Sequence, residues 1–229
     1  MGCYYEFFQK IQFHSMKSAK SSKAWIKKHV NDFFVKQAKK EGYRSRAAYK
    51  LIEISRRDHL LKPGITVVDL GATPGGWSQV AANKVGWSGK VFSLDILEMG
   101  ALPGVTFIQG DFEEEATLIE LRKKLGGKPV DLVISDMSPN LSGIGISDQA
   151  RSMYLAELAL EFSVEQLNLG GNFLVKVFQG SGFEQFLYTM RTSFKQVVTR
   201  KPEASRGRSN EIYLLGLGKQ EKILQSLSK

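Results

Sequence analysis

Residues 66–77 read TVVDLGATPGGW, and this stretch decides the fold that we expect for the chain. Its first five residues are largely β-branched or apolar, which predicts a buried strand. The glycine-rich turn that follows leads into a sequence typical of a helix. A strand, a glycine turn and a helix in this order indicate an α/β protein that holds a ligand at the carboxyl end of a strand.

Further strands are predicted toward the C-terminus. Four short apolar runs are separated by segments long enough for crossover helices, so we expect them to join a parallel sheet. They are KVFSLD (90–95), VTFIQGD (105–111), VDLVISD (130–136) and NFLVKVF (172–178). Two last strands are predicted at 196–201 and 211–218. Together these elements predict a Rossmann-like, doubly wound α/β fold with a seven-stranded, mostly parallel sheet flanked by helices.

The longest helix should follow Asp148, because leucine, alanine and phenylalanine recur there at spacings of three and four residues. We expect Gly170 and Gly171 to stop it. Shorter helices are predicted at 46–55 and near 183–194. Since ligands of such sheets bind at the carboxyl ends of the strands, functional residues should be sought there.

The length of 229 residues suits one α/β domain with a full core and is scarcely enough for two. We expect a flexible N-terminal extension at 1–21, a single domain at 22–219 that begins with a basic arm at 22–50, and a C-terminal tail at 220–229. Cys3 is the only cysteine, which excludes an intramolecular disulfide and a multi-cysteine metal site. No run is long and apolar enough to cross a bilayer, and the first residues do not form a signal peptide. We therefore expect a cytoplasmic protein without a metal or a membrane partner.

The net charge of +9 is concentrated in one part of the chain. Residues 17–50 hold eleven lysines or arginines against Asp32 and Glu41, so this stretch carries the whole excess. A cationic arm on a neutral body favours a polyanionic partner such as RNA, because each phosphate contact releases counterions. The alternative is a solvated tail that only aids solubility, and composition alone leaves both open.

The glycine turn excludes two better-known phosphate-binding loops. The dinucleotide pattern G-x-G-x-x-G requires glycine where Thr73 stands, and the G-x-x-x-x-G-K-[ST] loop requires lysine where Trp77 stands. A nucleotide-like cofactor without a polyphosphate fits the turn better, and S-adenosylmethionine is such a cofactor.

Two carboxylates at the ends of neighbouring strands support this choice of cofactor. Asp95 closes the second strand and could accept both ribose hydroxyls, as the acidic residue of the dinucleotide fold does. Asp111 closes the third strand and could accept a hydrogen bond from the adenine amino group, while Trp77 or its neighbours wall the site. Singly, each aspartate is more often a turn residue. The cofactor-binding residues we predict are Asp69, Gly71, Gly75, Gly76, Trp77, Asp95, Asp111 and Asp136.

Lys176 interrupts the apolar strand FLVKVF, where an unpaired charge would be costly, so it should point to a cleft at the end of the strand. A desolvated lysine, or one beside another cation, can act as the general base that an alcohol requires. The alternative is a lysine that guards the edge of the sheet. Asp136 closes the fourth strand and could face both cofactor and base. Taken alone, Lys50 and Glu211 are read as surface charges.

From about Ser22 to Gly218 the chain resembles the FtsJ/RrmJ (RlmE) family, the bacterial branch of RNA ribose methyltransferases that act on ribosomal RNA. The stretches that carry the resemblance are SSKAWIKKHVND, KEGYRSRAAYKL, VVDLGATPGGWSQ, SDMSPNLSG, FLVKVFQG and KPEASRGRSNEIY, in the family's order. Thr73 departs from the alanine usual in the glycine turn. The resemblance implies a class I S-adenosylmethionine methyltransferase fold over the single domain.

The resemblance also implies the roles of a Lys-Asp-Lys-Glu tetrad, which falls on Lys50, Asp136, Lys176 and Glu211. Lys176 would take the hydroxyl proton, in a neutral form favoured by Lys50. Asp136 would orient Lys176, and Glu211 would hold the ribose or Lys50. The cofactor positions that the family implies fall on Gly75, Trp77, Asp95, Asp111 and Asp136.

The acceptor implied by the resemblance is the ribose 2′-hydroxyl of a uridine in large-subunit (23S) ribosomal RNA, within the assembled 50S subunit. We expect a monomer that RNA reaches along a set of basic residues, namely Lys39, Lys40, Arg44, Arg46, Arg206 and Arg208. A base-modifying enzyme would carry an N-P-P-aromatic or D-P-P-aromatic turn where this chain has SDMSPN. The alternatives that stay open are a transfer RNA or messenger-cap ribose methyltransferase and a non-catalytic ribosome-assembly factor.

Overall fold

The computed structural model describes residues 32–139, 143, 145–205 and 210–221. The predicted extension at 1–21 and the beginning of the arm lie outside this part of the chain. Seven strands form one sheet, in the order β3-β2-β1-β4-β5-β7-β6. The strands are β1 Thr66–Leu70, β2 Lys90–Asp95, β3 Val105–Gln109, β4 Val130–Ser135, β5 Leu167–Phe178, β6 Phe194–Arg200 and β7 Glu211–Lys219.

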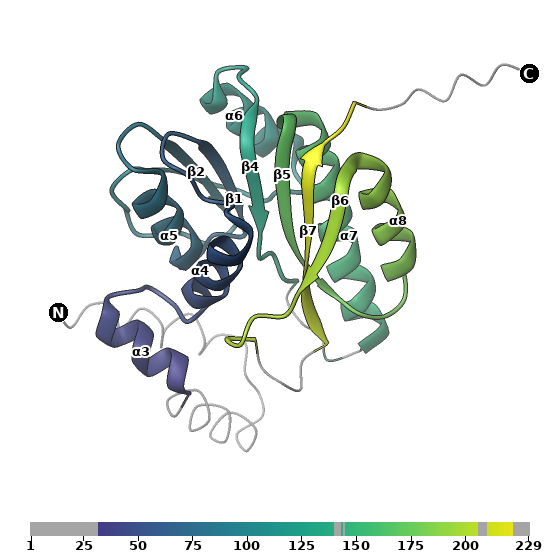
Figure 1. Ribbon diagram of the computed structural model, residues 1–229, viewed down its shortest axis with the longest axis horizontal. Coiled ribbons are helices and arrows are strands. Elements are labelled where there is room, and N and C mark those ends of the chain that lie inside the picture. The colour runs from purple at the N-terminus through teal and green to yellow at the C-terminus, as the bar shows by residue number, and fades with distance from the viewer. Residues whose placement is uncertain (1–31, 140–142, 144, 206–209, 222–229) are drawn as a thin grey trace, which may run out of the picture.

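Helices cover both faces of the sheet, as Figure 1 shows. The described helices are α3 Phe33–Glu41, α4 Ala47–Asp58, α5 Gly76–Val85, α6 Glu115–Leu125, α7 Gly145–Gln166 and α8 Phe183–Ser193. None of these helices is long and apolar enough to span a membrane. The Rossmann-like α/β fold and the seven strands predicted from the sequence are confirmed.

The direction of the strands determines which ends meet at the functional edge. Strands β1 to β5 run parallel, whereas β7 is inserted antiparallel between β5 and β6. Phe178, the last residue of β5, therefore pairs with Glu211, the first residue of β7. The antiparallel insertion places the beginning of β7 at the same edge as the ends of β1 and β4.

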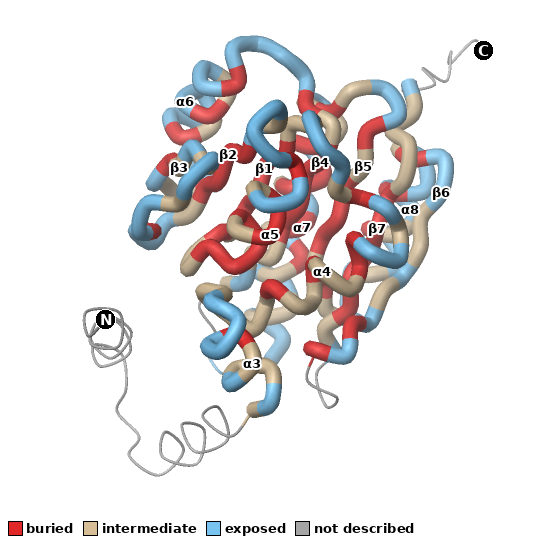
Figure 2. Tube along the Cα trace, turned by 60° about the vertical axis from the view of Figure 1, so that its left-hand side comes forward, coloured by how far each residue is buried: buried red, intermediate tan, exposed pale blue. Residues whose placement is uncertain are grey.

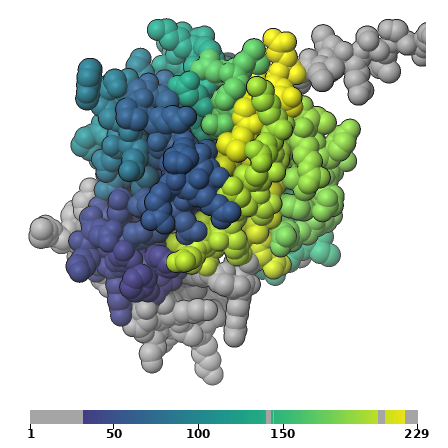
Figure 3. All heavy atoms as spheres, in the orientation of Figure 1, coloured from purple at the N-terminus to yellow at the C-terminus, as the bar shows by residue number. Residues whose placement is uncertain are grey.

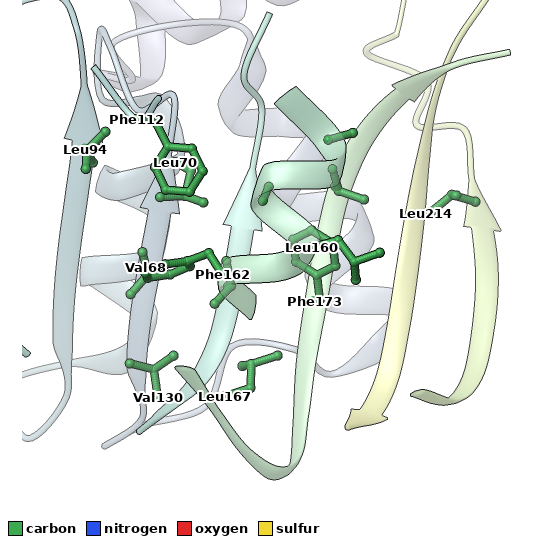
Figure 4. Close-up of a cluster of buried hydrophobic side chains, with 14 of the residues drawn as sticks. Val68, Leu70, Leu94, Phe112, Val130, Leu160, Phe162, Leu167, Phe173 and Leu214 are labelled. Carbon is green, nitrogen blue, oxygen red and sulfur yellow. The ribbon is translucent and has the colours of Figure 1, made fainter. Parts of the chain in front are cut away.

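Two apolar clusters hold the helices to the two faces. Strand residues alternate between them: Val68 and Phe173 pack with α6, α7 and α8, and Val67 and Leu174 pack with α4 and α5. Figure 4 shows part of the first cluster, in which Phe162 of α7 lies against the strands. The inner strands are mostly buried, whereas the edge strands β3 and β6, the loops and the outer helix faces are largely exposed or half-buried, as Figure 2 shows. The sheet is therefore a rigid support for groups at its edge.

The prediction for the longest helix was wrong at both ends. The helix α7 begins at Gly145, before Asp148, and it ends at Gln166, with strand β5 starting at the next residue. Gly170 and Gly171 belong to β5, where the pairing with β4 shifts register and Gly170 has φ 81°. These glycines accommodate an irregularity in a strand instead of ending a helix.

Candidate active site

The four residues of the predicted tetrad come from different elements, and the structure brings them together. Lys50 lies on α4, Asp136 directly follows β4, Lys176 lies in β5 and Glu211 begins β7. By strand alternation, the last three lie on the α4 and α5 side of the sheet: Asp136 and Lys176 each come two residues after a residue that faces this side, and Glu211 comes two residues before one. Lys50 reaches them from α4, so one face of one sheet edge collects all four.

Among the described residues, Lys176 makes polar contacts with Asp136 alone. Its Nζ donates to the backbone carbonyl of Asp136 at 2.6 Å and lies 3.2 Å from the carboxylate Oδ1 of Asp136. The side chain of Lys176 is 7% exposed, and that of Asp136 is 19% exposed. The lysine is therefore a nearly buried amine held against the end of β4, and it does not guard an edge, because β5 lies between β4 and β7.

Lys50 and Glu211 form a second ion pair beside the first. The Lys50 Nζ lies 2.8 Å from Glu211 Oε1, although the two residues are 161 positions apart. Ser205 Oγ donates to the same carboxylate oxygen at 3.0 Å, and Lys201 donates to the backbone carbonyl of Glu211. The side chains of Lys50 and Glu211 are 11% and 15% exposed, so neither residue is a free surface charge.

Tyr213 joins the two ion pairs, and sequence reasoning missed it. Its hydroxyl accepts from Lys50 Nζ at 2.9 Å and donates to Asp136 Oδ1 at 2.9 Å. The same hydroxyl lies 3.3 Å from Glu211 Oε1. The signal was present in the sequence: Tyr213 stands two residues after Glu211 in a strand, so both side chains project from one face.

Trp77 packs against the ring of Tyr213. Its ring lies 5.7 Å from the Tyr213 ring, and its Nε1 donates to the backbone carbonyl of Ala47 at 2.8 Å. The Trp77 side chain is 2% exposed. Its indole is thus a core group between α4, α5 and β7, and any contact with a cofactor would come through its backbone amide in the first turn of α5.

The ionisation states in this cluster follow from burial and from neighbouring charges. Burial acts to raise the pKa of Asp136, but Lys176, Lys50 and the hydrogen bond from Tyr213 outweigh it and lower the pKa below its ordinary value. Burial and the nearby carboxylates of Asp136 and Glu211 raise the pKa of Tyr213 well above its usual range. Asp136 is therefore an anion, and Tyr213 keeps the proton that it donates.

The glycine turn between β1 and α5 lies directly beside the tetrad. A Cβ atom on Gly71 would come within 2.8 Å of the backbone of Met137, the residue after Asp136. The amide of Asp136 also donates to the carbonyl of Leu70 at 3.1 Å. Gly71 has φ 76°, so both its conformation and its close approach to Met137 require glycine. Any larger residue would push the turn away from Asp136.

The next two glycines lie against protein side chains, and Gly75 also has φ 103°, which disfavours any residue with a Cβ atom. A Cβ atom on Gly75 would come 2.8 Å from Met99 Sδ and 2.9 Å from Leu102 Cδ1, and one on Gly76 would overlap Ser45 Oγ. Gly75 is the N-cap of α5, and no side chain caps that helix end. The first-turn amides of α5 are thus left to an acceptor from outside the helix.

Asp95 and Asp111 end β2 and follow β3 at the same edge of the sheet. Asp95 accepts from the amides of Thr73 and Leu97, each at 2.8 Å, and so links the glycine turn to the loop after β2. Asp111 accepts from the amide of Glu113 at 2.9 Å. Each carboxylate keeps lone pairs that these bonds do not use. The departure at Thr73 adds one contact, since its hydroxyl donates to the carbonyl of Leu97 at 3.1 Å.

Asp69 is fully buried beneath the turn. Ser78 Oγ donates to its Oδ2 at 2.6 Å, while its Oδ1 has no hydrogen-bond partner in the part of the chain that the structure describes. Burial raises the pKa of Asp69 to about 7, with further contributions from Asp136 and Asp95 against the lowering effect of Ser78. Asp69 is therefore a structural carboxylate with one oxygen left without a partner.

The predicted RNA-binding residues divide into three groups. Lys39 and Lys40 are exposed in the last turn of α3. Arg44 donates to three backbone carbonyls of the protein, and Arg46 pairs with Asp32 and donates to the carbonyl of Ala204. The other two, Arg206 and Arg208, lie outside the described residues. Figure 3 shows the purple α3 and the yellow-green segment before β7 on one face of the molecule.

A cavity of about 970 Å³ lies elsewhere, between α7 and α8. Its lining includes Leu169 near the start of β5 and Lys219 at the end of β7, which places it at the opposite edge of the sheet. It contains no member of the tetrad and no residue of the glycine turn. Within the described residues, no group of three or more histidine, cysteine or acidic side chains is placed to hold a metal ion.

Comparison with known proteins gives consistent matches. The family model of FtsJ-like methyltransferases matches residues 43–219. "Ribosomal RNA large subunit methyltransferase E" of Nitrosospira multiformis is 70% identical over 206 residues, which cover 90% of this chain and 100% of that protein. The protein of the same name from Nitrosomonas eutropha is 67% identical and covers 89% of this chain and 99% of its own length.

A solved structure from Plasmodium falciparum, described as that of a ribosomal RNA methyltransferase, is also similar. It superimposes with a TM-score of 0.69 at 32% identity and covers 77% of this chain and 98% of its own length. The region matched by the family model, residues 43–219, contains β1 to β7 and all four residues of the tetrad.

Proposed function

Since the chain belongs to the FtsJ-like methyltransferase family, we propose that it methylates the ribose 2′-hydroxyl of a uridine in large-subunit ribosomal RNA, with S-adenosylmethionine as donor. The names of its relatives support ribosomal RNA as the substrate, and the resemblance to the ribose-modifying branch supports a ribose hydroxyl as the acceptor. We further propose that the assembled 50S subunit is the substrate and that the enzyme works in the cytoplasm as a monomer.

The contact between Lys176 and Asp136 is the observation that carries this proposal. An amine accepts a proton only in its neutral form, which has two N–H donors and one lone pair. The two oxygens of Asp136 near Lys176 Nζ, at 2.6 and 3.2 Å, occupy two donors. Lys176 would act as the base only after losing its own proton, and it would then keep its lone pair for the acceptor hydroxyl while Asp136 fixes its direction.

The other residues of the cluster position this pair. Tyr213 donates to Asp136, and the Lys50–Glu211 ion pair holds Tyr213 from the other side. Glu211 would accept a hydrogen bond from a ribose hydroxyl, and the partial exposure of its carboxylate supports this role. Alignment of the hydroxyl, more than removal of its proton, should supply most of the acceleration.

The residues around the glycine turn fit S-adenosylmethionine. When bound, this cofactor supplies an electrophilic methyl group on a sulfonium sulfur. Asp95 would accept from the ribose hydroxyls and Asp111 from the adenine amino group. The uncapped first turn of α5 would donate to the carboxylate. The methyl group would pass from the sulfonium sulfur to the ribose oxygen, and Lys176 would take the hydroxyl proton.

One experiment tests the acceptor. The protein is incubated with methyl-labelled S-adenosylmethionine and, in separate reactions, with intact 50S subunits, free ribosomal RNA or transfer RNA, all from cells that lack the enzyme. We expect label on one uridine 2′-oxygen of the large-subunit RNA, and more label on 50S subunits than on free RNA. Label on a base or on transfer RNA would overturn the proposal, and no transfer to any RNA would favour a non-catalytic assembly factor.

A salt titration tests the RNA surface. Replacing both Lys39 and Lys40 by alanine should weaken RNA binding and reduce the slope of log K against log salt by about one for each lost phosphate contact. The matched control is Lys84→Ala, an exposed lysine at the far end of α5. An unchanged slope in the double variant would remove the end of α3 from the RNA path.

A further inference from the structure

Arg44 stands in the turn between α3 and α4, at residues 42–46, and its side chain is directed into the protein. Its Nη1 donates to the carbonyls of Gly100, at 2.6 Å, and Pro74, at 3.3 Å. Its Nη2 donates to the carbonyl of Ala101 at 2.6 Å. Pro74 belongs to the glycine turn, whereas Gly100 and Ala101 belong to the loop after β2. One guanidinium therefore bridges the two loops that carry the cofactor-binding residues.

Gln79 of α5 fastens the same turn from the other side. Its Nε2 donates to the carbonyl of Gly42 at 2.8 Å, and its Oε1 accepts from the amide of Arg44 at 3.0 Å. The backbone of Arg44 is thus fixed to the helix that follows the glycine turn. Because both ends of Arg44 are held, its guanidinium has a defined position relative to α5.

The packing around the bridge leaves little room for movement. Met99, in the loop after β2, is 6% exposed and would lie 2.8 Å from a Cβ atom on Gly75, and Arg44 Nη1 would lie 3.1 Å from that atom. On the inner side, Asp95 ties the same two loops through the amides of Thr73 and Leu97. The loops are therefore clamped twice, by Asp95 inside and by Arg44 outside.

We propose that Arg44 is a positioning residue of the cofactor site: it holds the glycine turn and the loop after β2 at a fixed separation and couples them to helix α3. This rests on the proposed function, in that the cofactor is S-adenosylmethionine. It also revises the role predicted from the sequence, since a phosphate would have to compete with three carbonyls for the same donors. Without the bridge, the two loops have to be ordered by the cofactor, which lowers its affinity.

The test measures S-adenosylmethionine binding by calorimetry with no RNA present. Arg44→Ala should raise the Kd about tenfold and Gln79→Ala by a smaller factor. In turnover, the KM for S-adenosylmethionine should rise while kcat at saturating cofactor stays near that of the wild type. Arg44→Lys, which keeps one cationic donor, should recover part of the affinity. Lys36→Ala is the control, an exposed cation of α3 outside the predicted RNA-binding set, and it should leave the Kd unchanged.

Three outcomes are distinguishable. A Kd for Arg44→Ala within twofold of the wild type overturns the inference, as does a lower salt slope for RNA with an unchanged Kd, which would make Arg44 a phosphate ligand. If the wild type itself binds no S-adenosylmethionine, the proposed function fails and the inference fails with it. Should Arg44→Ala not fold, the Arg44→Lys and Gln79→Ala variants decide, and wild-type affinity in both overturns the inference.

Discussion

The two halves of the site are built in different ways. On the glycine-turn side, the ties are mostly between backbone amides and the carboxylates or carbonyls of nearby loops, as with Asp95 and Thr73. On the tetrad side, side chains from α4, β5 and β7 meet over long sequence separations, as with Lys50 and Glu211. The first half should tolerate side-chain changes that leave these ties to the backbone intact, whereas the second depends on functional groups that act on the substrate.

Lys176→Ala should have the largest effect, and it tests whether the two halves of the site act separately. Loss of the base should lower kcat about 10³-fold, since general-base catalysis contributes on that scale, while calorimetric binding of S-adenosylmethionine stays near the wild-type value. The matched control is Lys195→Ala, an exposed lysine in the edge strand β6, which should retain full activity. A loss of cofactor binding equal to the loss of rate would show that the two halves are not separable.

Asp69 tests the cofactor half through stability. Because the pKa of Asp69 is raised from 3.8 to about 7 in the folded protein, folding disfavours its ionised form. Its contribution to stability is complete below about pH 4 and is lost as the pH rises through about 7. The free energy of unfolding of Asp69→Asn should gain on the wild type by roughly 3 kcal/mol between these limits. Urea unfolding of both proteins at pH 4.5 to 8 measures this difference, and a flat difference would contradict it.

Tyr213→Phe sharpens the comparison on the tetrad side. The variant keeps the ring against Trp77 but loses the hydroxyl between Lys50 and Asp136, so kcat should fall about tenfold, which corresponds to the loss of roughly one hydrogen bond. The Kd for S-adenosylmethionine should not change. Tyr188→Phe, an exposed tyrosine of α8, is the control. A wild-type kcat in Tyr213→Phe would show that the Tyr213 hydroxyl does not contribute to the rate.

Thr73→Ala should have the smallest effect. It removes one exposed hydrogen bond to the carbonyl of Leu97 but leaves the Thr73 amide bound to Asp95. Affinity for S-adenosylmethionine should therefore fall by less than about threefold, the scale of a weak exposed hydrogen bond. Calorimetric titration measures it, and a tenfold loss would show that the Thr73 hydroxyl, and not only its backbone amide, holds this half of the site.

The sequence by itself determined the strands, because a buried parallel strand requires a short apolar run and each run lies where the structure has a strand. It also determined the residue types of the site, since a lysine inside an apolar strand and aspartates at strand ends are local signals. The predicted end of α7 was wrong. Gly170 and Gly171 can end a helix or lie at an irregularity in a strand, and only the pairing with β4 distinguishes the two cases.

Only the tertiary structure decided how these residues are connected. The antiparallel insertion of β7 brings Glu211 and Tyr213 to the edge where β4 and β5 end, and this depends on strand order, which apolar patterning does not encode. The tertiary structure also directs the Arg44 side chain into the protein, where it donates to three carbonyls, although the sequence places Arg44 in the basic arm. Charge and periodicity are properties of neighbouring residues, whereas hydrogen-bond partners are fixed by contacts between residues far apart in the chain.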